Sequence, residues 1–167
     1  MSAAKPGRAM ITLDAGGIRF TYRVVAVALH NGRVLIHRAE TDDFWALPGG
    51  RAELGETAHD TLRREMREEL GQEVDVERLL WVAETFFGHA GRRCHELGLY
   101  FLITFRDPAI YRHDAPFCGD EGGLRLIFTW QPLAQLDATR LYPTFLRERL
   151  RDLPLATDHI VHHDPED

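Results

Sequence analysis

The sequence predicts a single mixed α/β domain, in which a β-sheet packs against a small number of helices. Several runs of β-branched and aromatic residues are separated by turn residues, as in a series of strands. Two other segments repeat apolar residues at helical spacing. The chain has 167 residues, of which 44% are hydrophobic, so it can bury one sizeable core. We expect the domain to span residues 9–152, with flexible or loosely attached termini at residues 1–8 and 153–167.

The N-terminal part of the chain predicts two β-hairpins. Turn residues from Asp14 to Gly17 separate two β-rich runs, and the pair Asn31-Gly32 is the strongest short signal for a second hairpin. About three consecutive antiparallel strands should result. The run 23–30 is apolar at nearly every position, which suits a central strand covered on both faces.

A loop and then a helix are expected next. Residues 41–56 are rich in turn-forming residues. The helix should run from about Thr57 to Leu70, because Thr57 and Asp60 resemble a capping box and Gly71 stands where a C-terminal cap belongs. Apolar residues recur at every fourth position and form the stripe that should pack inward, namely Ala58, Leu62, Met66 and Leu70.

The rest of the chain predicts more strands and a second helix. Residues 76–88 and 94–105 have the β-branched and aromatic content of two long strands. A polar loop leads to another strand at residues 124–133. Residues 141–153 repeat apolar positions as a second amphipathic helix would, and residues 159–163 are a candidate terminal strand.

The composition is that of an ordinary soluble globular protein. No apolar run approaches the roughly 18 residues of a membrane span, and no apolar secretory signal opens the chain, so we expect a cytoplasmic protein without membrane attachment. The net charge of −6 argues against binding a nucleic-acid polymer through a broad basic face, but it allows an anionic small molecule in a locally basic pocket. The cysteines, Cys94 and Cys118, are too few for a disulfide framework and lack zinc-binding spacing.

Three glutamates crowd the expected helix, at Glu65, Glu68 and Glu69. Residues three or four positions apart are neighbours on a helix, and like charges there cost about 0.2–0.5 kcal/mol per pair. Arg64 lies four positions before Glu68, whereas no cation of the helix lies three or four positions from Glu65 or Glu69. The helical rotation places all three beside the apolar stripe, at the edge of the core. Either solvent or a cation from outside the helix must therefore compensate Glu65 and Glu69.

The segment from Gly50 to Gln72, GRAELGETAHDTLRREMREELGQ, resembles the signature of the Nudix hydrolase family, G-x5-E-x7-R-E-U-x-E-E-x-G-U, where U is a bulky apolar residue. The residues at the fixed positions are Gly50, Glu56, Arg64, Glu65, Met66, Glu68, Glu69 and Gly71. Gln72 departs from the apolar final position, although Val74 could supply the missing packing. A chance match to the fixed positions is about a one-in-a-million event. The preceding FWALPGG is also typical of the family.

By this resemblance, the fold is an α/β/α sandwich with a mixed β-sheet, and the box forms a loop-helix-loop. The family implies a metal-dependent pyrophosphohydrolase that cleaves a phosphoanhydride bond of a nucleoside diphosphate derivative by water attack. Mg²⁺ is the implied cofactor, with Mn²⁺ as an alternative, since clustered oxygen donors suit a hard divalent cation.

The resemblance also implies roles for the residues of the box. Glu65, Glu68 and Glu69 would bind the metal, together with a backbone carbonyl that the turn at Gly50 aims toward it. Arg64 would orient Glu65 by a charge-assisted hydrogen bond, which makes Arg64, Glu65 and Glu68 the expected catalytic residues of the box.

Two further box residues have structural roles by the same resemblance. Glu56 would bind Arg64 or a metal-bound water, and Gly71 would end the helix. Glu53, in the loop, is expected to be exposed to solvent.

The general base stays open at this point. Glu121, beside Asp120 in the loop CGDEGG, is the first candidate, with an ordinary turn residue as its competing interpretation. Glu96 and Glu84 are the other candidates, because each alternates with apolar residues on an expected strand and needs a cation or a wet cleft.

Candidate substrate-binding residues are Arg38 and Arg51, which lie near the box in the sequence, and Trp45, which could stack on a base. Other aromatic residues could stack or belong to the core, namely Phe86, Phe87 and Tyr100. The implied partner is a nucleotide-derived small molecule. A homodimer is common in the family, and the apolar segment 97–105 could supply its interface.

The alternative function is a catalytically silent domain that senses a nucleotide or binds a protein. Such domains often lose glutamates of the box, and this chain keeps all of them. A calcium-binding structural module is disfavoured, because the acidic residues lie mostly on a helix and not in a 12-residue loop.

Overall fold

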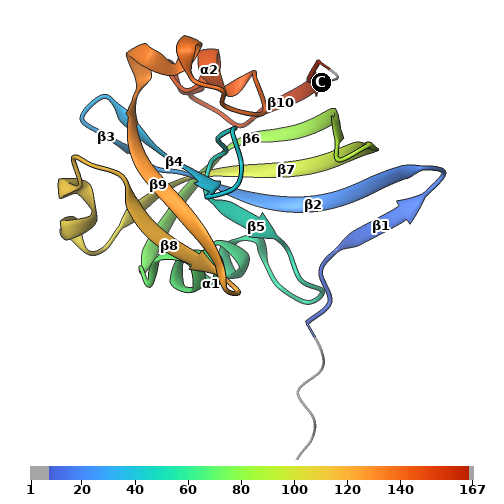
Figure 1. Ribbon diagram of the computed structural model, residues 1–167, viewed down its shortest axis with the longest axis horizontal. Helices are drawn as coiled ribbons and strands as arrows, with labels where there is room; N and C mark the ends of the chain where they lie inside the picture. Colours follow the sequence, from blue (N-terminus) through green and yellow to red (C-terminus); the bar gives the residue numbers. More distant parts are fainter. Residues whose placement is uncertain (1–7, 166–167) are drawn as a thin grey trace, which may run out of the picture.

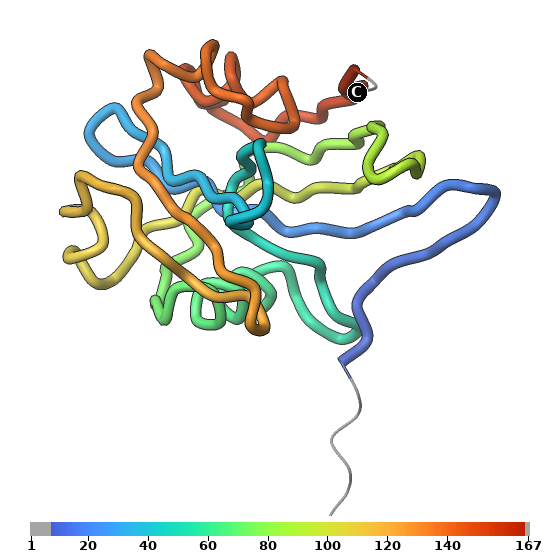
Figure 2. The backbone as a smooth tube through the Cα atoms, viewed as in Figure 1, coloured from blue at the N-terminus to red at the C-terminus, as the bar shows by residue number. Residues whose placement is uncertain are grey.

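A computed structural model describes residues 8–165, so most of the expected N-terminal tail and residues 166–167 lie outside the described residues. Two β-sheets lie between one long helix, α1 (Ala58–Leu70), and a short helix, α2 (Leu146–Arg149) (Figure 1). The chain trace shows the long hairpin of residues 74–105 and the N-terminal strands reaching out together on one side (Figure 2). Between residues 8 and 165, no helix is long and apolar enough to cross a membrane.

The larger sheet is mixed, as predicted. Its strands follow the order β1-β2-β7-β6-β10, and β5 also pairs with β2. Strand β2 runs parallel to β7, and β10 runs parallel to β6, whereas the other pairs are antiparallel. The bounds are β1 (Thr12–Ala15), β2 (Ile18–Val27), β5 (Gly49–Arg51), β6 (Val74–His89), β7 (Arg92–Phe105) and β10 (Asp158–His163).

The smaller sheet is antiparallel, with the order β3-β4-β9-β8. Its strands are β3 (Leu29–His30), β4 (Arg33–Ala39), β8 (Phe117–Glu121) and β9 (Leu124–Pro132). The predicted hairpin turn between β3 and β4 is confirmed, since Asn31 and Gly32 have the positive φ angles, 48° and 71°, that a two-residue turn requires.

The expectation of three consecutive antiparallel strands is wrong. Strand β2 belongs to the larger sheet and β4 to the smaller one. One edge of β2 is taken by β7 and the other by β1 and β5, so β4 finds no free edge there. The apolar run of β2 explains this central position, because residues from Val24 to Ala28 are almost fully buried.

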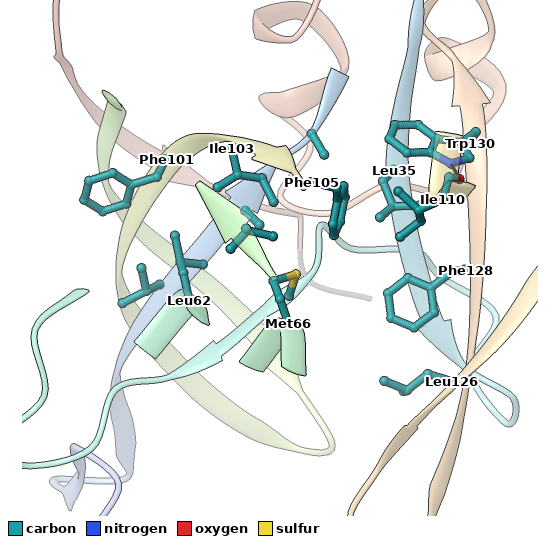
Figure 3. Packing of buried hydrophobic residues seen from close by; sticks show 14 of the residues in the cluster. Leu35, Leu62, Met66, Phe101, Ile103, Phe105, Ile110, Leu126, Phe128 and Trp130 are labelled. Atoms are coloured by element: carbon teal, nitrogen blue, oxygen red, sulfur yellow. Dashed lines mark hydrogen bonds between the residues drawn. The ribbon is translucent and has the colours of Figure 1, made fainter. Parts of the chain in front are cut away.

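The side chains of β2 alternate between two cores, as the pleat of a strand requires. Val24 and Ala26 pack in the core that also holds Leu62 and Met66 of α1. Figure 3 shows this core, where side chains of α1 and the larger sheet meet those of β4 and β9. Val25 and Val27 point into the second core, with residues of the 3₁₀ helix η2 (Leu133–Ala138) and of α2. The predicted α/β/α arrangement is therefore confirmed.

The second amphipathic helix, expected at residues 141–153, is much shorter than predicted. Only Leu146–Arg149 is α-helical, although Leu146 and Leu150 are buried as the apolar pattern indicates. Pro143 restricts the residue before it to extended backbone, and Pro154 does the same at the other end, so the helix cannot extend far in either direction.

The C-terminal segment lies within the larger sheet. The candidate strand at residues 159–163 is confirmed as β10, which pairs with β6 along its whole length. Ile160 is 7% exposed and belongs to the second core. The loose attachment expected after residue 152 therefore does not describe this segment.

The two long strands are confirmed as β6 and β7, joined by a turn at Ala90 and Gly91. Strand β7 lies between β2 and β6, so both of its edges already carry hydrogen bonds within the sheet. Tyr100, Phe101 and Ile103 are buried in the cores. The segment 97–105 therefore offers neither a free strand edge nor these side chains to a second subunit.

Candidate active site

The helix of the box begins and ends as its sequence predicts. The Thr57 hydroxyl accepts a hydrogen bond of 3.1 Å from the Asp60 backbone N–H, and Gly71 ends the helix with a φ of 64°. The rotation of the helix between these two ends turns Glu65 and Glu69 toward the interior, where they are 6% and 2% exposed, and leaves Glu68 at the surface. Two carboxylates of the same helix are thus buried one turn apart.

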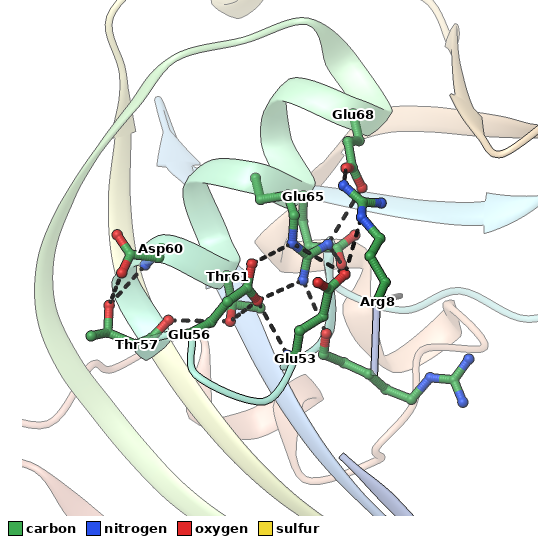
Figure 4. A network of polar contacts seen from close by, with 10 residues as sticks. Arg8, Glu53, Glu56, Thr57, Asp60, Thr61, Glu65 and Glu68 are labelled. Carbon is green, nitrogen blue, oxygen red and sulfur yellow. Dashed lines mark hydrogen bonds and ion pairs between the residues drawn. The ribbon is translucent and has the colours of Figure 1, made fainter. Parts of the chain in front are cut away.

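Arg64 joins the loop to the helix through its hydrogen bonds to Glu56 and Glu65. Figure 4 shows the polar network to which these two glutamates belong. Its Nε and Nη2 donate to the two oxygens of Glu56, at 2.7 and 2.9 Å, and its Nη1 donates to Glu65 Oε1 at 2.6 Å. Nη2 also donates to the Arg51 carbonyl at 3.2 Å. The expected contacts of Arg64 with Glu65 and Glu56 are both present. Such a fork of guanidinium hydrogen bonds fixes the orientation of the two carboxylate planes and favours their ionised form.

Glu56 is the main electrostatic partner of Arg64. The guanidinium, helped by the Glu53 N–H and the Thr61 hydroxyl, lowers the pKa of Glu56 from its ordinary 4.5 to about 2. Glu56 therefore stays ionised, and it holds Arg64 in place without being itself part of the helix.

Counting cations along the helix misassigned the partner of Glu65. Arg64, the residue directly before it, donates to Glu65 at 2.6 Å but lies 3.4 Å from Glu68. Glu68 also forms an ion pair with Arg8. Glu53, expected in solvent, has a side chain only 13% exposed, 3.4 Å from Arg8 and 3.7 Å from Arg64. The sequence predicted that neither Glu65 nor Glu69 has a cation from its own helix beside it, and this prediction is confirmed for Glu69 only.

Gly50 leaves room for the Glu65 carboxylate. A Cβ atom at Gly50 would overlap the carboxyl group of Glu65, whereas its φ lies in no unusual region. Its neighbour Gly49 combines a φ of 146° with a carbonyl that accepts a hydrogen bond from Arg23 at 3.3 Å. Glycine at position 50 is therefore required by space, and glycine at 49 by backbone conformation.

Glu69 is a buried carboxyl group without a hydrogen-bond donor for either oxygen. Burial, with Glu65 nearby, raises its pKa to about 9. Its nearest basic group is His37 of β4, whose Nδ1 is 3.7 Å from Oε2 and also lacks a hydrogen bond. The sequence prediction missed His37; its one signal is a histidine directly after the apolar run Val34 to Ile36.

Glu69 tests whether this site suits a divalent cation. An orphaned buried carboxyl group costs about 1–3 kcal/mol, which a cation would offset. Within residues 8–165, no group of three or more His, Cys, Asp or Glu side chains is already arranged as a complete metal site. The orphaned Glu69, with the carboxylates of Glu65 and Glu68 on the same helix, nevertheless fits a cation that takes its remaining ligands from water and substrate.

A cleft opens on the face of the sheet opposite α1. Residues from β2, β6 and β7 line it together with loops before β5 and after η2, including Arg23, Phe44, Phe87, Glu96, Tyr100 and Tyr142. Burial raises the pKa of Glu96, while Arg23 lowers it, and Thr21 donates to one of its oxygens at 3.2 Å.

Arg23 connects this cleft to the box. Its Nη2 donates to the carbonyls of Leu47 and Gly49, and its charge acts on Glu65, Glu69 and Glu96. The sequence prediction missed this residue, although a cation at the start of a buried apolar strand is a signal in itself.

The candidate general bases lie in different surroundings. Glu121 lies exposed at the end of β8, and its charge raises the pKa of Glu69. Glu96 lines the cleft. Glu84 instead pairs with His159 at 2.8 Å, and Asp120 accepts the Gly123 N–H in a turn.

The three predicted substrate residues lie apart from the residues that line the cleft. Arg38 donates to backbone carbonyls of its own loop, at Ala39, Glu40 and Asp42, and its guanidinium lies 5.2 Å from the centre of the Trp45 ring. Arg51 is opposite Arg23 in the β2–β5 register, and its charge lowers the pKa of Glu96. Of the three, Arg51 is thus electrostatically linked to the cleft.

Comparison with known proteins gives a consistent family. The family model described as NUDIX domain matches residues 20–153. Nucleoside triphosphatase NudI of Enterobacter sp. (strain 638) is 40% identical over 58 residues, which cover 32% of this chain and 41% of that protein. The chain spans between 25% and 41% of the length of the curated relatives that it matches.

Solved structures share the fold at low identity. A UDP-X diphosphatase superposes with a TM-score of 0.57 at 22% identity, over 78% of this chain and 59% of that one. An ADP-ribose pyrophosphatase from Streptococcus suis 89-1591 superposes with a TM-score of 0.56 at 14% identity, over 84% of this chain and 98% of that one. At these identities, the structures show the common architecture.

Proposed function

Because this chain belongs to the NUDIX domain family, we propose that it is a metal-dependent pyrophosphohydrolase of a nucleoside diphosphate derivative. The observation that carries the proposal is the buried, unpartnered Glu69 carboxyl group beside Glu65. A buried carboxyl group without a hydrogen-bond donor lowers the stability of the fold, and a bound cation would offset that loss.

The proposed metal ligands are the carboxylates of Glu65, Glu68 and Glu69, with the Gly50 carbonyl as the backbone donor. Mg²⁺ is the proposed cofactor and Mn²⁺ the alternative, because carboxylates suit both. When bound, such a cation makes a water more nucleophilic and stabilises charge that develops on phosphate oxygens. Arg8 already pairs with Glu68, so a cation would compete with that side chain.

The proposed roles of the other residues follow from their contacts. Arg64 holds Glu65 in one orientation, and Glu56 holds Arg64. Glu121, near Glu69 at the surface, is the carboxylate proposed to take the proton from the attacking water. Arg64 and Glu56 thus position the Glu65 carboxylate, directly and through Arg64, and Glu121 moves a proton.

The cleft is the proposed place for the nucleoside part of the substrate. Aromatic rings of Phe44, Phe87 and Tyr142 line it, and they can stack on a base. Arg23 lies between the cleft and the box glutamates and would bind a phosphate, with Arg51 opposite it in the sheet. The names of the relatives cover nucleoside triphosphates, UDP derivatives and ADP-ribose, so the proposal names the shared class.

Arg38 and Trp45 stay proposed substrate residues of a second rank. Their cation–π contact, with the Arg38 guanidinium 5.2 Å from the centre of the Trp45 ring, could hold a substrate group outside the cleft. The proposed substrate is a small molecule, and a cytoplasmic location fits its supply of nucleotides.

The test is hydrolysis of a nucleotide panel with Mg²⁺ or Mn²⁺, covering dNTPs, nucleoside diphosphates, dinucleoside polyphosphates, ADP-ribose and NADH. We expect turnover of at least one class and a loss of about 10²–10⁴-fold in Glu69→Gln. The matched control is Glu73→Gln, an exposed glutamate paired with Arg67, which should keep normal turnover. Binding of nucleotides without any hydrolysis would instead support the silent nucleotide-sensing domain.

A further inference from the structure

Three buried polar atoms converge without partners between α1 and β4. They are both carboxyl oxygens of Glu69 and the Nδ1 atom of His37, and none has a hydrogen bond. Nδ1 and Oε2 are 3.7 Å apart, which is too long for a hydrogen bond. Buried polar atoms are nearly always paired, so this gap indicates that a third group belongs between them.

An ordinary ion pair does not explain this arrangement. An ion pair of this kind brings the imidazole nitrogen and a carboxylate oxygen to hydrogen-bond distance, whereas here neither Nδ1 nor either Glu69 oxygen has a hydrogen bond. An imidazole nitrogen that carries no proton offers a lone pair, and this is the form that binds metals.

His37 is held rigidly in this position. Its backbone pairs with Ala46 on one side, at 2.8 and 2.9 Å, and with Phe128 of β9 on the other. The Phe128 ring packs against the imidazole with a centroid distance of 5.3 Å.

We propose that His37 is a nitrogen ligand of the divalent cation that Glu69 holds, which gives this site a mixed nitrogen and oxygen ligand set. The inference rests on the proposed function for the presence of a cation at Glu69. Two neighbouring ligands of one cation, each about 2.1 Å from it, are about 3.0–3.4 Å apart at the angles of 90–110° that octahedral and tetrahedral sites use. The observed 3.7 Å therefore requires the two side chains to approach each other by only about 0.3–0.7 Å when a cation binds.

A nitrogen ligand changes which cation the site prefers. Imidazole suits Zn²⁺, Fe²⁺ and Ni²⁺ and also binds Mn²⁺, though more weakly, whereas Mg²⁺ prefers ligands that are all oxygen. The other charged groups around the pair are Arg23, Glu65 and Glu121, and the two carboxylates add the negative charge that holds any divalent cation. His37 would therefore shift the preference toward transition metals, while the carboxylates keep some affinity for Mg²⁺.

Pulsed electron paramagnetic resonance on the full chain with one equivalent of Mn²⁺ and no substrate tests the proposal directly. We expect nuclear modulation from a directly bound ¹⁴N nucleus, which changes to the ¹⁵N pattern when the protein is labelled with ¹⁵N-histidine. A spectrum with no histidine nitrogen coupling would overturn the inference. This measurement needs no mutation, so it stands even if position 37 tolerates no change.

A pair of variants assigns the nitrogen to one residue. In His37→Gln, the coupling should disappear, and the affinity for Mn²⁺ should fall about 10-fold or more while that for Mg²⁺ changes less than about 2-fold. The control is His59→Gln, an exposed histidine at the start of α1 that packs against Phe101 and should keep both the coupling and the affinities. Coupling that persists in His37→Gln, or equal losses for the two metals, would contradict the proposal.

Failure of the His37 ligand assignment can be distinguished from failure of the proposed hydrolase function. Histidine coupling in a protein that hydrolyses no nucleotide supports the ligand assignment and removes the hydrolase proposal. Hydrolysis with Mg²⁺ and no histidine coupling to Mn²⁺ does the reverse.

Discussion

The carboxyl group of Glu65 lies where the side chain of residue 50 would begin, so Gly50 and Glu65 share one small volume between β5 and α1. No other residue type fits there without displacing the carboxylate. A loop glycine and a helix glutamate, 15 positions apart in the sequence, are therefore a single steric unit.

Gly50→Ala should weaken metal binding while the fold persists. The added methyl group must push Glu65 away from Arg64, or β5 away from α1, because the overlap involves the carboxyl carbon and both oxygens. We expect a loss of about 10-fold or more in Mn²⁺ affinity, measured by titration calorimetry. Gly88→Ala is the control, since nothing lies within 4 Å of a Cβ there, and an equal loss in both variants would refute the steric account.

Arg64→Lys should destabilise the protein more than the same change at Arg67. A lysine cannot form the fork to Glu56 and also reach Glu65, so partly buried carboxylates lose donors. Urea unfolding should show a loss of about 2–4 kcal/mol. Arg67 also bonds both oxygens of its partner Glu73, but at the surface, where solvent screens the pair and the loss should be much smaller.

Glu69→Gln should lower metal affinity more than Glu68→Gln. Glu69 is buried without a donor, whereas Glu68 is exposed and already has Arg8 and Arg64 as partners. Isothermal titration with Mg²⁺ should show the larger loss for Glu69, by about 10-fold or more. Equal losses would mean that burial and partners do not decide which carboxylate matters most.

Metal binding near pH 7 should release about one proton from Glu69. Its folded pKa, about 9, lies above the ordinary 4.5, so the folded protein holds an extra proton between these values. The free energy of unfolding of the metal-free protein should accordingly fall as the pH rises from about 4.5 to about 9. A bound cation requires the ionised form and removes that loss. Calorimetry in buffers of different ionisation enthalpy measures the released proton, which Glu69→Gln should abolish.

Removing β10 should destabilise the whole domain. A chain that ends at Thr157 loses the ladder with β6, the buried Ile160, and the Asp164 side chain that accepts hydrogen bonds from Thr144. We expect about 3 kcal/mol of lost stability, which corresponds to a Tm lower by about 6–12 °C. A chain that ends at Pro165 is the control and should unfold like the full protein. Equal Tm values for both chains would restore a domain boundary near residue 152.

The helix of the box and both hairpin turns could be read directly from the sequence. Thr57, Gly71 and the Asn31-Gly32 pair act through their own backbone and nearest neighbours, and local chemistry of this kind does not depend on the rest of the fold. The order of Arg64, Glu65, Glu68 and Glu69 likewise sufficed to identify the family.

The tertiary structure alone decided which charges compensate one another. Arg64 turns toward Glu56 and Glu65 because the loop brings Glu56 beside the helix, and helical spacing cannot show that. It also decided the neighbours of β2 and the inclusion of β10, since pairing between distant strands depends on which edges stay free. His37 and Arg23 come close to the box glutamates for the same reason. The strands that carry these two residues pack near the helix of the box, although both residues are distant from that helix in the sequence.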